Sequence, residues 1–163
     1  MGKGSIAVLR VLSVLLLGGS LYLQGVLAPL LGVDMAEAGA PGWLRTAVVT
    51  ILVLGVLCGQ VVVVCVWQLL TLVRRGTVFT SAAFRYVHVI IVALAVAAGL
   101  LLALGAVLAP TEVAPGIVLV IGGLAASVAA VAMLVWVMRA LLAQAVSTRT
   151  EAEHLRSELD EVI

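Results

Sequence analysis

Long apolar runs without a charged residue dominate the pattern of hydrophobic and polar positions along this chain. Each run exceeds the roughly 20 residues that an α-helix needs to cross a bilayer. The four uncharged windows are 11–33, 46–73, 86–111 and 113–138. The pattern therefore predicts an all-α membrane protein with four transmembrane helices. We expect these helices at about 6–31, 46–73, 81–109 and 116–140.

Short loops with helix-breaking residues connect the predicted helices. The first loop contains Pro41 and Gly42, and the last contains Pro110 and Pro115. Such breakers end helices and mark turns, and connections this short favour antiparallel neighbours. We expect one compact antiparallel bundle that forms a single integral membrane domain. A short cytoplasmic helical tail at 141–163 should follow it.

Basic residues are distributed unequally between the two ends of the predicted bundle. Every lysine and arginine except Arg45 lies before the first uncharged window, between the second and third windows, or after the fourth. Cytoplasmic segments are enriched in Lys and Arg, so both termini are predicted to be cytoplasmic. The first apolar run is longer than the 7–15 residues (roughly) of a signal-peptide core, which predicts that it stays as a membrane helix.

Composition agrees with this assignment and narrows the function classes. The chain is 64% hydrophobic and only 10% charged, whereas a soluble domain carries about 25% charged residues. The net charge of +1 gives no electrostatic reason to expect direct nucleic-acid binding. The principal surroundings of the protein should be the lipid bilayer.

The predicted spans contain little chemistry. None of the four uncharged windows holds an Asp, Glu, Lys or Arg, although ion-coupled carriers usually keep an ionisable residue at that depth. Cys58 and Cys65 fit no metal-binding spacing, and no nucleophile–base set is visible. We therefore expect no enzymatic activity, no metal and no cofactor. Gln60 is the deepest strongly polar side chain, and it could form an interhelical hydrogen bond or contact a ligand or pore.

Small residues recur at a spacing of four along the second, third and fourth helices. Such stripes let helix backbones approach closely in lipid. They could serve packing within the bundle or a homodimer, and the sequence does not divide the two roles. The stripes are Gly55 and Gly59, then Ala95, Gly99 and Ala103, then Gly122, Ala126 and Ala130.

The stretch "RRGTVFTSAAFRYVHVI" and the chain end "ELDEVI" carry most of the polar detail. In the first, Thr80 suits the N-cap of the third helix and Phe79 could pack on Phe84 as a hydrophobic staple. In the tail, apolar residues follow a three–four spacing that indicates a heptad seam. The tail could continue the fourth helix, or a capping box of Thr148 and Glu151 could start a new one.

These two segments together resemble the bacterial family known as domain of unknown function 2975. The resemblance covers nearly the whole chain. It implies a small four-span protein of the bacterial cytoplasmic membrane, often encoded beside a helix-turn-helix regulator. It therefore implies a cytoplasmic regulator protein as a partner.

Our leading hypothesis is a non-enzymatic sensory or regulatory membrane protein. One alternative is a small transporter or permeability protein with a polar path near Gln60, Gln68 and Thr71. The other is an accessory subunit of a larger membrane complex. In the leading hypothesis, a cytoplasmic face formed by the third-helix turn and the tail binds the regulator. The residues of this docking face are Arg74, Arg75, Phe79, Arg85, Glu151, Leu155 and Leu159.

Overall fold

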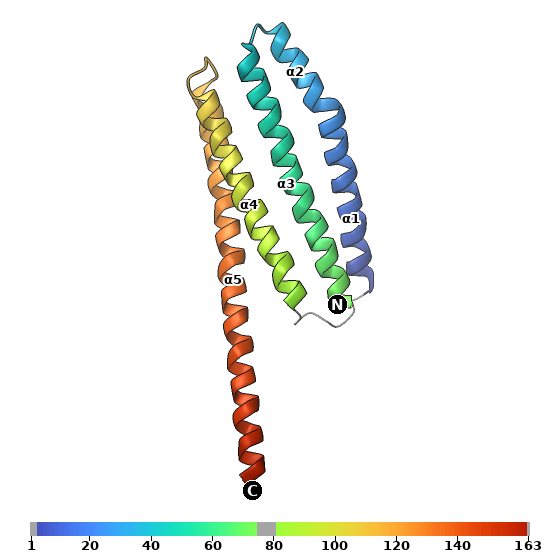
Figure 1. Cartoon of the computed structure of the whole chain (residues 1–163). Helices are drawn as coiled ribbons and strands as arrows, with labels where there is room; N and C mark the ends of the chain where they lie inside the picture. Colours follow the sequence, from blue (N-terminus) through green and yellow to red (C-terminus); the bar gives the residue numbers. More distant parts are fainter. Residues whose placement is uncertain (1–2, 75–80, 163) are drawn as a thin grey trace.

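The computed structural model describes residues 3–74 and 81–162. In these two ranges all regular secondary structure is helical, and no strand occurs (Figure 1). The elements are α1 (Lys3–Tyr22), the π-helical segment η1 (Leu23–Leu27), α2 (Ala28–Glu37), α3 (Gly42–Arg74), α4 (Ser81–Leu108) and α5 (Pro115–Val162).

Four stretches of helix are long and apolar enough to cross a membrane. The first joins α1, η1 and α2 into one span, and α3, α4 and α5 supply the other three. The spans are Val8–Glu37, Gly42–Leu72, Arg85–Leu108 and Pro115–Ala145. The predicted all-α class and the four helices of membrane-spanning length are therefore confirmed, as expected of a multi-pass membrane protein.

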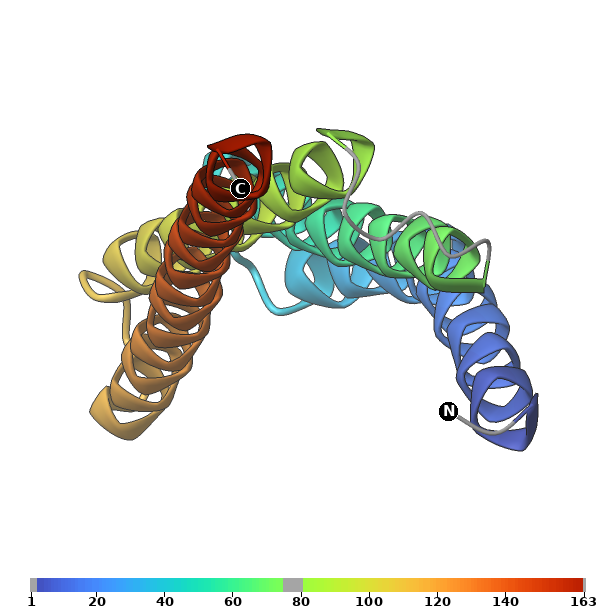
Figure 2. The same ribbon diagram turned by 90° about the horizontal axis from the view of Figure 1, so that it is seen from below.

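Consecutive spans run antiparallel, but they form an open row where a compact bundle was expected. Helix α3 packs against α1 and α2 on one side and α4 on the other, and α4 packs against α5. Figure 2 shows the row as an arch, with α1 at one end and α5 at the other. Lipid tails are as apolar as leucine side chains, so no hydrophobic force closes the arch as it would in water. The expectation of a compact bundle was wrong for this reason.

Small side chains allow the close approach of α4 and α5. The buried positions on α4 include Ala98 and Gly105, and those among the described side chains of α5 are Ala125 and Ala132. A Cβ placed on Gly105 would lie 3.7 Å from Cγ2 of Ile121 on α5, which is ordinary van der Waals contact. The two helices thus meet through small residues, as packing in lipid favours.

The buried small residues of α4 and α5 are not those of the predicted stripes. Most of the stripe residues on α4 and α5 are exposed, among them Ala95, Gly99, Ala103, Ala126 and Ala130. These helices carry small residues on more than one face, so a spacing of four does not show which face meets a neighbour. A homodimer built on the exposed stripes stays a prediction.

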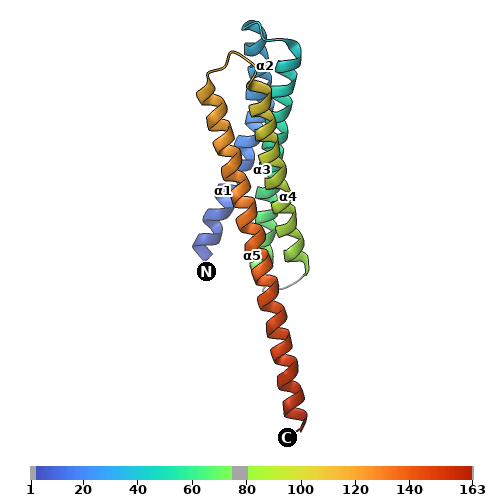
Figure 3. The same ribbon diagram turned by 90° about the vertical axis from the view of Figure 1, so that its left-hand side faces the viewer.

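Helix α5 is a single helix of 48 residues, about 72 Å long at roughly 1.5 Å per residue. The stretch Pro115–Ala145 is long and apolar enough to cross a membrane. The remainder extends well past the ends of the other helices (Figures 1 and 3). The hydroxyl of Thr148 donates to the carbonyl of Gln144 at 3.0 Å, one turn back in the same helix. The tail therefore continues the fourth span, and no capping box begins a new helix there.

Candidate functional site

A polar cluster inside the membrane-spanning region joins the first span to α3. The Gln60 side-chain amide on α3 donates from Nε2 to Ser20 Oγ at 2.9 Å and to Gln24 Oε1 at 3.1 Å. Gln24 Nε2 in turn donates to the backbone carbonyl of Val53 at 3.3 Å. Ser20 Oγ also donates to the carbonyl of Leu17 at 2.8 Å. Both amide hydrogens of Gln60 are thus occupied by the neighbouring helix.

The π-helical turn η1 places Gln24 in this cluster. A π-helix forms i→i+5 hydrogen bonds and is often found at functional sites. Here the N–H of Ala28 donates to the carbonyl of Leu23. Pro29 follows directly; it has no N–H, and its ring displaces the carbonyl of Gly25, four residues earlier. The wider turn accommodates that displacement, as local π adjustments do at prolines in membrane helices.

Sequence reasoning identified Gln60 but not its partners. Two signals could have found them. Positions 20 and 60 are equidistant from residue 40 in the connecting loop, so an antiparallel hairpin places Ser20 and Gln60 at the same depth. Pro29 with Gly25 one turn earlier marks where the first span departs from regular α-helix. A contact of Gln60 with a ligand or transported solute stays a prediction.

Replacing Gln60 with leucine should weaken the contact between the first span and α3. The change removes two interhelical hydrogen bonds, and such bonds in membranes contribute about 0.6 kcal/mol each on average. We expect the free energy of unfolding in detergent to fall by about 1 kcal/mol. Gln68→Leu is the matched control, because Gln68 is an exposed glutamine on the same helix. Equal destabilisation by both changes would show that the cluster does not hold these helices together.

Arg10 and Trp67 form a second contact between the first span and α3. The guanidinium carbon of Arg10 lies 5.7 Å from the centroid of the Trp67 ring, within the range of a cation–π interaction. The Arg10 Nε atom is buried and has no hydrogen-bond partner. Trp67 also lines a cavity of 270 Å³ together with Leu17, Val64 and Gln68. The ring therefore contacts a side chain of the neighbouring helix.

Arg139 and His88 form the corresponding contact between α5 and α4. Arg139 Nη1 lies 3.4 Å from His88 Nδ1, and Arg139 Nε is buried without a partner. Arg85 is exposed one turn before His88 on α4, and residues three apart share a helix face. The three basic side chains of Arg85, His88 and Arg139 thus lie near the N-terminal end of α4.

The predicted docking face is only partly described. Arg85 is exposed. Arg74 ends α3, and Glu151, Leu155 and Leu159 lie on the α5 extension, all four with only the backbone described. Arg75 and Phe79 lie outside the described residues, as does the proposed cap at Thr80. The docking face therefore stays a prediction.

No cluster of metal ligands occurs in the described part of the chain. Its His, Cys, Asp and Glu residues form no group of three or more that could hold a metal ion. Both cysteines are free, Cys65 being buried and Cys58 half-buried. The side-chain hydrogen bonds among the described residues are made by amide, hydroxyl, imidazole and guanidinium groups.

One family model matches most of the chain. Residues 29–163 match the family model described as "Protein of unknown function (DUF2975)". The chain belongs to this family. The resemblance carried by the third-helix turn and the chain end is therefore confirmed. Gln60, His88 and Arg139 lie within the matched residues, whereas Ser20 and Gln24 precede them. No curated protein and no solved structure matches the chain.

Proposed function

We propose that this member of the family is a non-enzymatic regulatory membrane protein whose α5 extension binds a cytoplasmic protein. The observation that carries the proposal is the unbroken course of α5 from Pro115 to Val162. The extension continues past the ends of the other described helices, and none of them lies beside it there (Figure 3). A continuous helix fixes such an arm to the membrane span, so movement of the span would also move the arm.

The orientation follows from which helix ends lie together. The start of α1, the end of α3, the start of α4 and the α5 extension all lie at one end of the molecule (Figure 1). Arg10, Arg85 and Arg139 belong to that end, whereas Arg45 belongs to the opposite one. The positive-inside rule then supports both termini being in the cytoplasm of a bacterial cell.

Fusion of reporter proteins tests this orientation. Green fluorescent protein joined after Ile163 should fluoresce, because it folds in the cytoplasm. Alkaline phosphatase inserted at Gly39, in the loop between α2 and α3, should be active, because it needs the oxidising periplasm. The reverse pair of results would place the α5 extension outside the cell and end the proposal.

The sequence of the extension indicates what kind of partner it suits. Acidic residues outnumber basic ones there, and Leu155 and Leu159 continue the heptad seam. A partner would therefore present a helical apolar groove with basic residues beside it. A DNA-binding regulator has a basic surface for phosphate contacts. Its capture by the acidic extension would compete with its binding to DNA.

Co-purification from membranes tests the partner. The tagged full-length protein, extracted in mild detergent, should retain the helix-turn-helix regulator expected from the family resemblance. The double variant Leu155→Asp with Leu159→Asp should reduce that recovery about tenfold or more, the loss expected when apolar anchors leave a helix-in-groove contact.

The matched control is His154→Asp with Ser157→Asp, which adds acidic groups on the opposite side of the same helix. This control should retain the regulator. Equal loss with both double variants, or no recovery with the unaltered protein, would contradict the proposal.

A further inference from the structure

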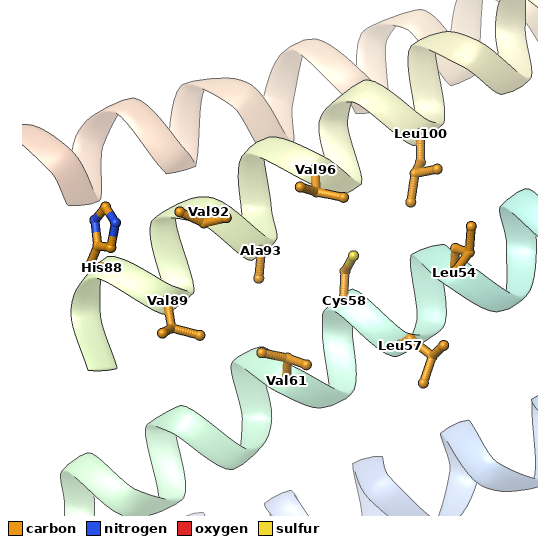
Figure 4. A pocket seen from close by; sticks show the side chains of 10 residues that line it. All are labelled: Leu54, Leu57, Cys58, Val61, His88, Val89, Val92, Ala93, Val96 and Leu100. Carbon is orange, nitrogen blue, oxygen red and sulfur yellow. The ribbon is translucent and has the colours of Figure 1, made fainter. Parts of the chain in front are cut away.

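A narrow apolar groove runs between α3 and α4 and ends at His88 (Figure 4). It has a volume of about 430 Å³. Cys58 and Val61 line it from α3, and Val89, Val96 and Leu100 line it from α4. His88 lies at the end of this lining, and its imidazole turns away from α3 toward α5 (Figure 4). The groove itself is thus almost wholly apolar, with a polar group beside its end.

The length of the groove matches one leaflet of a bilayer. Along α4 it extends from His88 to Leu100, which is about 18 Å at roughly 1.5 Å per residue. Half of the hydrocarbon core is about 15 Å. A chain that entered beside His88 would therefore reach close to the middle of the membrane.

Positive charge lies beside the His88 end of the groove, where α4 meets α5. Arg139 Nη1 lies 3.4 Å from His88 Nδ1, and Arg85 is exposed one turn away. The carboxylates whose side chains are described are Asp34, Glu37 and Glu112, and all belong to the loop end of the molecule opposite to His88 (Figure 1). Among the described side chains, none therefore neutralises Arg85 or Arg139.

We propose that this groove binds an anionic phospholipid. The phosphate would contact Arg139, Arg85 and His88, and one acyl chain would lie between α3 and α4. Arginine presents a planar set of donors that matches phosphate oxygens in pairs. Basic pockets between membrane helices on the cytoplasmic side bind acidic lipid headgroups. Here the basic groups lie where α4 meets α5, beside the end of the apolar groove between α3 and α4.

The charge at the mouth favours a phospholipid over a second copy of the chain. Each copy would bring its own Arg85 and Arg139 to the same place, and like charges in contact repel. A free phosphate ion would use only the polar end and leave the channel without a role. Unlike a second copy or a free phosphate ion, a phospholipid would bring both a phosphate for the basic groups and an acyl chain for the apolar groove.

Binding is measured by native mass spectrometry of the delipidated full-length protein in mild detergent. Phosphatidylglycerol should bind in preference to phosphatidylcholine. Arg139→Gln should weaken its binding about tenfold or more, as loss of a charge-assisted hydrogen bond implies. Arg139→Lys keeps the charge and should give an intermediate loss. Arg45→Gln removes an arginine at the opposite end and should leave binding unchanged.

A second pair of variants tests the channel. Val96 lines the groove and is 48% exposed, so Val96→Trp should fill the channel without disturbing a buried contact and should weaken phosphatidylglycerol binding. Val120 is 71% exposed on α5 and lies outside the groove, so Val120→Trp is the control.

Several results would overturn the assignment. Equal affinity for phosphatidylcholine would show that charge does not select the lipid. Competition by inorganic phosphate at equal concentration would show that the acyl chain does not contribute to binding. Unchanged binding after Arg139→Gln would remove the site itself. If that variant does not fold, Arg85→Gln serves instead because Arg85 is exposed, and unchanged binding there has the same meaning.

Discussion

Replacing Ala125 with tryptophan is expected to force α5 away from α4. Ala125 is 1% exposed, and α4 is the one helix against which α5 packs extensively in the described chain. Overpacking of a well-filled interior costs about 1–3 kcal/mol and occasionally more. The large increase from methyl to indole should place this change at the upper end, a loss of about 3 kcal/mol in the free energy of unfolding. Denaturation in detergent, followed by circular dichroism, measures it.

The adjacent residue supplies the control for this change. Ala126 is exposed, so Ala126→Trp adds the same ring to the same helix without meeting α4. We expect it to leave the stability almost unchanged. If Ala126→Trp destabilised the protein as much as Ala125→Trp, the face of α5 that meets α4 would have been misassigned.

A proline at position 147 should break the α5 extension from its span. In the interior of a helix, proline removes a hydrogen bond and clashes with the carbonyl four residues earlier, at a cost of about 3 kcal/mol or more. Residue 147 follows the stretch Pro115–Ala145 that is long and apolar enough to cross a membrane. Ser147→Pro should therefore bend α5 beyond the span and leave the span in place.

Spin labels at positions 138 and 157, in a background without the two native cysteines, measure this bend. An unbroken helix should hold the labelled backbones about 28 Å apart at roughly 1.5 Å per residue. Ser147→Pro should shorten and broaden the distance distribution. Ser147→Ala removes only the hydroxyl bond to the Gln144 carbonyl and should not change it. The same narrow distance in the proline variant would contradict this prediction, and a broad distribution in the unaltered protein would mean that the extension is not continuous with the span.

The four spans were predictable because charged residues are excluded from lipid, and their absence can be read directly from the sequence. The arrangement of the four spans as an open arch was not predictable in the same way. Helices such as α4 and α5 carry small residues on several faces, so periodicity cannot choose between Ala95 and Ala98 as the packing position. That choice depends on the partner helix, which local pattern does not contain.

The candidate sites also differ in whether the sequence alone could predict them. Gln60 was visible as a polar residue in an apolar run, and the symmetry of the hairpin could have supplied Ser20. The proximity of His88 and Arg139 joins residues 51 positions apart, and only the packing of α4 on α5 brings them together. The break or continuation of the fourth helix was left open by sequence because Thr148 suits both a cap and a helix interior.

The open row of helices also determines how effects spread through the molecule. Helices α1 and α5 share no extensive contact in the described chain, so the three interfaces are linked in series. Changes at sites without shared partners usually add, so Gln60→Leu and Ala125→Trp should destabilise the protein by the sum of their separate effects. A stimulus received by α1 would likewise reach the extension only by passing through α3 and then α4. Either intermediate helix could therefore be altered to uncouple the two ends while each end remained folded.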